Sequence, residues 1–112
     1  MTVHEMKLNK GPFEKIKAGT KTIEMRLYDD KRRKIQAGDI IEFEHIDTKD
    51  KISVRVMALY VYPSFEDLYK NFDKVSLGYE SHEIALYTDM EQYYLVTEIE
   101  KYGVVGIEIH RI

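Results

Sequence analysis

The stretch GTKTIEMR, residues 19–26, alternates polar and apolar residues in the pattern of a β-strand. Successive side chains of a strand point to opposite faces, so Ile23 and Met25 share one face. Glu24 and Arg26 share the other. The apolar face predicts a contact with a core, and the charged face suggests a binding site.

Lys21 has the parity of the apolar face, but it directly follows the Gly19-Thr20 turn. A long side chain at the start of a strand can swing out along the edge, so its amine can approach Glu24 and Arg26. The alternative is an ordinary solvated sheet face, whose charges contribute little to stability. The alternation alone leaves both interpretations open.

Length and composition predict one domain over residues 1–112, and the order of the expected strands and helices makes it an α+β domain. The chain has 112 residues, 44% of them hydrophobic and 33% charged, which is typical of a folded globular domain. The absence of cysteine excludes disulfides, thiolate metal sites and a cysteine nucleophile. Without a membrane-length apolar run or a signal peptide, we expect a cytoplasmic protein with no membrane contact. A monomer is expected, with a dimer as the alternative.

Charge is distributed unevenly along the chain. Between Lys7 and Lys34 there are ten basic and four acidic residues, a local net charge of +6, whereas the whole chain carries -3. A basic segment within an acidic protein favours a short or local contact with RNA or a nucleotide. The sequence carries no DNA-specific signal, and two surfaces of unremarkable charge remain the alternative.

The first half of the sequence predicts strands, a helix and tight turns. Strands are expected over residues 4–8, 21–27, 40–46 and 51–62, with a helix over residues 12–18 that Gly19 ends. Residues 29–34 predict a turn or a single helical turn. The strand at 51–62 has apolar residues on both sides, namely Val54, Val56 and Ala58 against Met57, Leu59 and Val61, so both of its faces are expected to be covered.

The second half predicts helices and a final strand. Ser64 is expected to cap a helix that buries Phe65, Leu68, Tyr69 and Phe72. Ser81 is expected to cap a short helix to about Leu86, and Thr88 with Glu91 a longer one ending near residue 102. The last strand covers residues 104–111. Together these elements predict a small β-barrel of about five or six strands flanked by helices.

Sequence motifs for metal or cofactor chemistry are absent. The four histidines occur singly and far apart, and there is no GxSxG, P-loop or GxGxxG motif. We therefore expect no metal site and no cofactor. The remaining candidates are the lysine and its carboxylate neighbour: as an ammonium, Lys21 with Arg26 suits a phosphate or carbonyl oxygen, and Glu24 suits an amino group such as that of cytosine. Tyr28 and Tyr79 are candidates for stacking on a base.

The segment GTKTIEMR resembles the GxKxxExR signature of the ASCH domain, a small β-barrel family related to the PUA RNA-binding fold. The order of the helix ending at Gly19, the AGD turn at 37–39, the hairpin, the two helices and the final strand also resembles that family over nearly the whole chain. The resemblance implies a cleft between barrel and helices that is lined by the motif residues and binds RNA or a nucleobase.

Some ASCH-like proteins are acetylcytidine amidohydrolases that use a lysine, a threonine three residues later and a downstream glutamate. Their lysine matches Lys21, but Glu24 stands where their threonine is. Glu80 is the best match for the glutamate, and Thr20 and Thr22 are nearby hydroxyls, with Thr22 two residues away from the matching position. A carboxylate beside Lys21 keeps its amine protonated, which disfavours that chemistry.

Two functions from different classes follow. The leading hypothesis is an RNA- or nucleobase-binding domain whose ligand contacts Lys21, Thr22, Glu24, Arg26, Tyr28 and Tyr79. The rival is a hydrolase, either an amidohydrolase on modified nucleosides or a metal-dependent ribonuclease, with Lys21, Glu24 and Glu80 as catalytic residues. A domain that serves protein contacts is the third interpretation.

Overall fold

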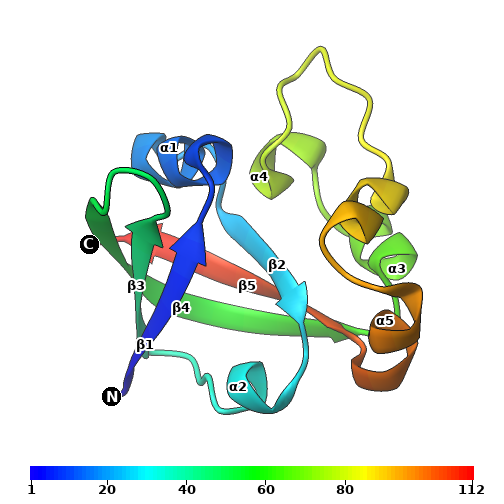
Figure 1. Cartoon of the computed structure of the whole chain (residues 1–112), viewed down its shortest axis with the longest axis horizontal. Helices are drawn as coiled ribbons and strands as arrows, with labels where there is room; N and C mark the ends of the chain where they lie inside the picture. Colours follow the sequence, from blue (N-terminus) through cyan, green and yellow to red (C-terminus); the bar gives the residue numbers. More distant parts are fainter.

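A computed structural model describes residues 1–112, and its five strands form one curled sheet (Figure 1). The strands are β1 (Val3–Leu8), β2 (Ile23–Leu27), β3 (Ile40–His45), β4 (Lys51–Tyr62) and β5 (Val104–Arg111). Their order in the sheet is β1-β3-β4-β5-β2; β1 pairs with β3 in parallel and all other pairs are antiparallel. The sheet is therefore a half-barrel whose free edges are β1 and β2, which confirms the predicted α+β barrel.

Helices cover the barrel unevenly. The helix α1 (Lys10–Ala18) connects the two edge strands, and α2 (Asp30–Arg33) follows β2. On the other side of β2 lie α3 (Phe65–Lys70), α4 (Lys74–Leu77), the 3-10 helix η1 (Tyr87–Gln92) and α5 (Val96–Tyr102), which form a helical layer (Figure 1). No helix is long and apolar enough to cross a membrane.

Two hydrophobic cores lie on opposite faces of β2 and β5. The barrel core consists of buried apolar residues of β1, α1, β3, β4 and β5 together with Ile35, and its largest fully buried side chain is Phe43. The second core joins Ile23, Met25 and Leu27 to the helical layer. The predicted apolar face of β2 is thus buried, and it packs on the helices rather than in the barrel.

Capping residues in the sequence explain where α1 ends and where α3 begins. Gly19 ends α1 with φ 84°, a left-handed conformation that glycine adopts without strain, and Phe13 and Ile16 are its buried residues. Ser64 caps α3 as expected, since its hydroxyl accepts a hydrogen bond from the Asp67 amide at 3.2 Å.

The region from residue 73 to residue 102 differs from the expectation. The predicted Ser81–Leu86 helix is wrong: these residues form a loop, in which Ile84 is 80% exposed, so a helix there would bury no stripe. The helical turn instead precedes Gly78, as α4. The predicted helix from Thr88 is also wrong, because the chain forms η1 and then a separate α5.

A β-bulge in β4 corrects a further expectation. Val56 pairs with Ile109 and Ala58 with Glu108, so Met57 is an extra residue opposite no partner. Val54 and Val56 are buried, but Met57 and Val61 are each half exposed. After the bulge Val61 pairs with Val105 of the barrel core, so it lies on the barrel side of the strand. The prediction that both faces of this strand are covered is therefore wrong at Met57 and at Val61.

Asp39 joins the start of β1 to the turn before β3. Its buried carboxylate accepts hydrogen bonds from the amides of Thr2 and Gln36, and it lies 2.8 Å from His4 Nε2. These hydrogen bonds lower the pKa of Asp39 to about 2. A carboxylate whose pKa is lower in the folded protein stabilises it at neutral pH and stops doing so when it is protonated.

We predict that Asp39→Asn lowers the urea midpoint of unfolding at pH 7. The folded pKa is depressed, so the advantage of the unmodified protein is complete above its ordinary pKa of 3.8 and disappears as the pH falls toward 2. Urea denaturation of both proteins from pH 7 to 2 measures this. A midpoint difference that stays constant over the range would contradict it.

Candidate functional site

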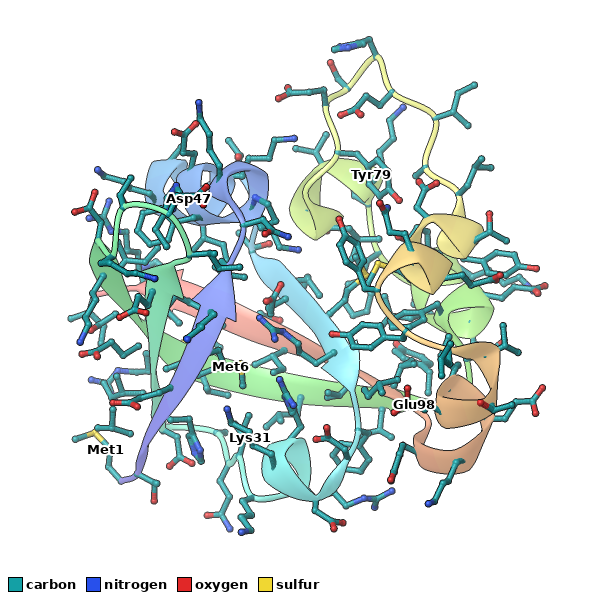
Figure 2. All side chains as sticks on the ribbon, viewed as in Figure 1. Met1, Met6, Lys31, Asp47, Tyr79 and Glu98 are labelled. Atoms are coloured by element: carbon teal, nitrogen blue, oxygen red, sulfur yellow. The ribbon has the colours of Figure 1, made fainter.

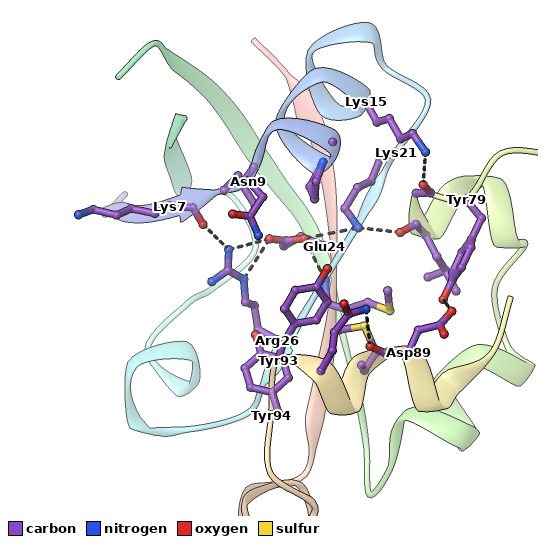
Figure 3. Close-up of a pocket in the computed structure, with 18 of the residues that line it drawn as sticks. Lys7, Asn9, Lys15, Lys21, Glu24, Arg26, Tyr79, Asp89, Tyr93 and Tyr94 are labelled. Atoms are coloured by element: carbon purple, nitrogen blue, oxygen red, sulfur yellow. Dashed lines mark hydrogen bonds and ion pairs between the residues drawn. The ribbon is translucent and has the colours of Figure 1, made fainter. Parts of the chain in front are cut away.

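A pocket of about 560 Å³ opens between β2, the start of α1 and the helical layer (Figure 3). Its size lies within the usual range for sites that bind small molecules. Its charged lining residues are Lys7, Lys15, Lys21, Glu24, Arg26, Glu83 and Asp89, and its aromatic ones are Tyr69, Tyr79, Tyr93 and Tyr94. The structure thus brings four predicted site residues, Lys21, Glu24, Arg26 and Tyr79, to one pocket.

The charged face of β2 points toward the barrel. Glu24 is paired with Ile107 of β5 and Arg26 with Val105, and these two partners belong to the barrel core. Directly paired residues of antiparallel strands lie on the same face. Glu24 is therefore only 4% exposed, and the interpretation of this face as solvated does not hold.

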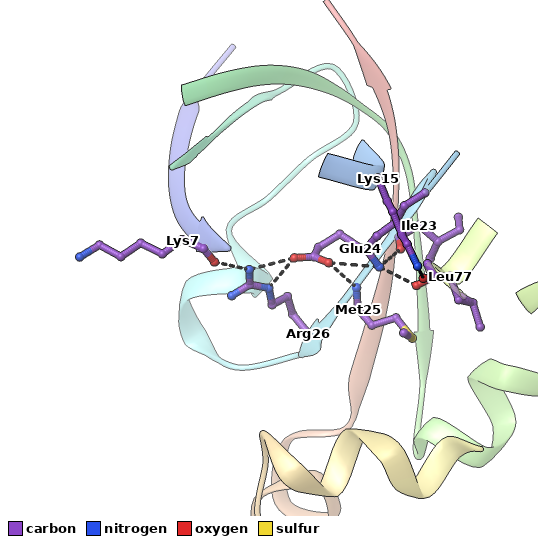
Figure 4. A network of polar contacts seen from close by, with 9 residues as sticks. Lys7, Lys15, Ile23, Glu24, Met25, Arg26 and Leu77 are labelled. Carbon is purple, nitrogen blue, oxygen red and sulfur yellow. Dashed lines mark hydrogen bonds and ion pairs between the residues drawn. The ribbon is translucent and has the colours of Figure 1, made fainter. Parts of the chain in front are cut away.

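Glu24 uses all its hydrogen-bonding capacity within the protein (Figure 4). Its Oε2 accepts from Arg26 Nε at 3.0 Å and Nη2 at 2.8 Å. Its Oε1 accepts from the Met25 amide at 3.3 Å and lies 3.5 Å from Lys21 Nζ. A carboxylate offers about four acceptor positions, so the two contacts of Oε1 are the ones that a ligand can exchange most easily.

Lys21 is equally enclosed. Its side chain turns toward Glu24, and Nζ also donates to the carbonyl oxygens of Ile23 at 2.8 Å and Leu77 at 2.7 Å. Gly78, with φ 110°, packs against the stem, because a Cβ there would lie 3.1 Å from Lys21 Cδ. Three acceptors around one amine match the three donors of an ammonium group.

Burial and charge act against each other in this group. Burial lowers the pKa of Lys21, while Glu24 raises it. Burial alone would raise the pKa of Glu24, but the charges of Arg26 and Lys21 outweigh it and hold that pKa below its usual value. Glu24 is thus a carboxylate at neutral pH, held between two cations.

Arg26 closes the gap between the sheet edges. Its Nη2 donates to the Lys7 carbonyl of β1 at 3.0 Å, so one guanidinium contacts both β1 and Glu24 of β2. Its Nη1 has no hydrogen-bond partner in the protein. Arg26 is thus the member of the group with spare donors.

A second polar network lines the helical side of the pocket. Tyr79 donates to Asp89 Oδ2 at 2.7 Å, and its hydroxyl lies 2.8 Å from that of Tyr69. Burial, the hydrogen bonds and the nearby carboxylate raise the pKa of Tyr79, so it stays a neutral donor. The network fixes one oxygen of Asp89 and leaves Oδ1 without a hydrogen-bond partner.

Three residues predicted for the site do not line the pocket. Thr22 lies just before β2, where its backbone bonds to Ser76 and Ile109. The face of Tyr28 is covered by the Arg33 guanidinium, 4.3 Å from the ring centre. Glu80 is exposed and pairs with Lys15, 3.4 Å away.

Several lining residues were not predicted. Lys15 lies on α1 and donates to the Gly78 carbonyl at 2.6 Å, which connects α1 to the end of α4. Asp89 of η1 also lines the pocket, as do Tyr93 and Tyr94 in the connection between η1 and α5. The Gly78 turn was visible in the sequence, but the packing of η1 on β2 was not. No three His, Cys, Asp or Glu side chains are grouped as metal ligands.

Comparison with known proteins identifies the family. Residues 6–112 match the family model of the ASCH domain. The crystal structure of hypothetical protein PH0355 is 37% identical, with a TM-score of 0.79 and 100% of each chain covered. The solution NMR structure of protein PF0455 from Pyrococcus furiosus is 36% identical, with a TM-score of 0.70 and 98% of this chain and 97% of that one covered.

No curated protein matches the sequence. The family match nevertheless covers nearly the whole chain, and both solved structures share its fold at more than 30% identity. The chain therefore belongs to the ASCH domain family, whose members have a PUA-like fold and are generally associated with RNA.

Proposed function

We propose that this protein binds a nucleobase or nucleotide of single-stranded RNA in the pocket above Lys21, Glu24 and Arg26. The observation that carries the proposal is a buried, fully hydrogen-bonded charge group at the floor of an open pocket that is partly aromatic. Burying charged groups costs free energy, and a few buried polar groups in a pocket are typical of a site that binds a polar ligand.

The pocket offers complementary contacts to a nucleotide. Glu24 Oε1 can accept from an exocyclic amino group, such as that of cytosine, in exchange for its long contacts to Met25 and Lys21. Tyr93 is 55% exposed and provides an aromatic surface for a base. Arg26 Nη1 and Lys7 supply donors for a phosphate.

We predict that Tyr93→Ala weakens the binding of short single-stranded RNA. Stacking of a base on an aromatic ring is worth about 1–3 kcal/mol, so we expect a loss of roughly 5- to 100-fold. Fluorescence anisotropy at low salt measures it. The matched control is Tyr87→Ala, because Tyr87 begins the 3-10 helix whose C-cap is Tyr93, is 40% exposed and does not line this pocket. Equal affinities for the two variants would contradict the assigned pocket.

We predict that Lys21→Met abolishes this binding. The change keeps the buried stem, but it removes the ammonium that orients Glu24 and bonds Leu77. The control is Lys17→Met, since Lys17 lies on α1, is exposed and forms no side-chain contact with the pocket. Circular dichroism checks folding, because loss of one partner of a buried ion pair costs about 3–5 kcal/mol. A folded Lys21→Met protein with unchanged affinity would sink the proposal.

Hydrolysis of a modified nucleoside is the second candidate, and one observation favours it. Burial lowers the pKa of Lys21, the direction that a lysine base or nucleophile requires. Its three acceptors favour the ammonium instead. We therefore expect no product when the protein is incubated with acetylcytidine, or with RNA and a divalent cation. Product formation that Lys21→Met or Glu24→Gln abolishes would establish the enzyme.

A further inference from the structure

Two cationic side chains, those of Arg26 and Lys31, lie along the outer edge of β1. They lie in the gap between the unpaired edges of β1 and β2, which we call the seam. Figure 2 shows Lys31 between α2 and β1. Arg26 Nη2 donates to the carbonyl of Lys7 at 3.0 Å, and Lys31 Nζ donates to that of Glu5 at 2.8 Å. These carbonyls are two residues apart, or about 6.6 Å along a strand. The spacing is comparable to that of successive phosphates in an extended nucleic acid strand.

Both cations have donors to spare. Arg26 Nη1 is unpartnered, and Lys31 uses one of its three donors. Lys7 is exposed next to them and forms no ion pair. Burial and the charges of Arg32 and Arg26 lower the pKa of Lys31, as expected where positive charge is concentrated.

The acids near the seam do not cancel this charge. Glu5 is exposed on β1, and Asp30 is exposed at the start of α2. Asp29 is occupied by Arg32, 3.0 Å away. Glu24 is paired with Arg26, 2.8 Å away. Four acids therefore stand against six bases, which are Lys7, Arg26, Lys31, Arg32, Arg33 and Lys34. The seam is therefore the basic part of the +6 segment.

The other rims of the pocket are not basic. On the α1–α4 side, Lys15 Nζ lies 3.4 Å from Glu80 and 4.0 Å from Glu83, so its charge is compensated. On the η1 side, Asp89 lines the pocket and Glu91 is exposed. A polyanion that enters the pocket is thus attracted along the seam, and the α1–α4 and η1 rims do not attract it.

We infer that an RNA strand with one base in the pocket runs along the β1–β2 seam toward α2, and that Arg26 and Lys31 bind its backbone phosphates. This inference rests on the proposed function and adds the path of the strand. The seam contacts act on phosphates, so they contribute affinity without base preference. On this path a single nucleotide has its one phosphate at Arg26 and no second phosphate for Lys31.

The experiment compares Lys31→Glu with Lys101→Glu. Lys101 is exposed on α5 in the helical layer, so its change alters net charge equally but leaves the seam intact. Isothermal titration measures the binding of each ribonucleoside monophosphate, and anisotropy that of a mixed-sequence single-stranded RNA octamer. For the octamer we expect Lys31→Glu to lose about tenfold more affinity than the control, and for the monophosphates no difference. Lys31→Ala should reduce the salt slope of octamer binding by about 0.7.

The outcomes separate the two proposals. If neither monophosphates nor the octamer bind the unmodified protein, the proposed function fails. If the octamer binds but Lys31→Glu behaves like Lys101→Glu, the proposed function stands and the seam path is wrong. A loss of monophosphate binding in Lys31→Glu also overturns the seam path, because it places Lys31 within the pocket contacts. Thermal melting of each variant confirms that only folded protein is compared.

Discussion

The buried carboxylate of Glu24 is the constraint on which the rest of this structure depends. A lone carboxylate cannot be buried at acceptable cost, so Arg26 and Lys21 must stay within reach of it. Lys21 in turn requires the Leu77 carbonyl and the close approach of Gly78, which fixes α4 against β2. Arg26 requires the Lys7 carbonyl, which fixes β1. One charge thus organises both the barrel edge and the helical layer.

The sequence predicts much of the fold, because strand alternation and helix caps are local signals. The alternation around Ile23 and the cap at Ser64 are confirmed. Local signals fail where packing decides. The bulge at Met57 changes which side of β4 is covered, and the loop at residues 81–86 keeps Ile84 exposed, although its sequence resembles a capped helix.

The candidate site was only partly predictable for the same reason. Alternation gives the parity of Glu24 and Arg26, but not that their face meets the barrel core. The resemblance to the signature motif supplied the expectation of a cleft lined by these residues, and Lys21, Glu24 and Arg26 do line one pocket. Asp89 lies on η1 and Tyr93 is the C-cap of η1, whose position depends on tertiary contacts, so no short-range pattern could place these two residues in the pocket.

The junction between β1 and β2 has a mechanical consequence. No ladder hydrogen bonds join these strands, and a guanidinium spans the gap in their place. A barrel closed by backbone pairing has a fixed circumference, whereas a side-chain clasp can lengthen or shorten by rotating about its own bonds. The width of this barrel is therefore set by a side-chain contact along one line, while backbone hydrogen bonds hold every paired strand in register.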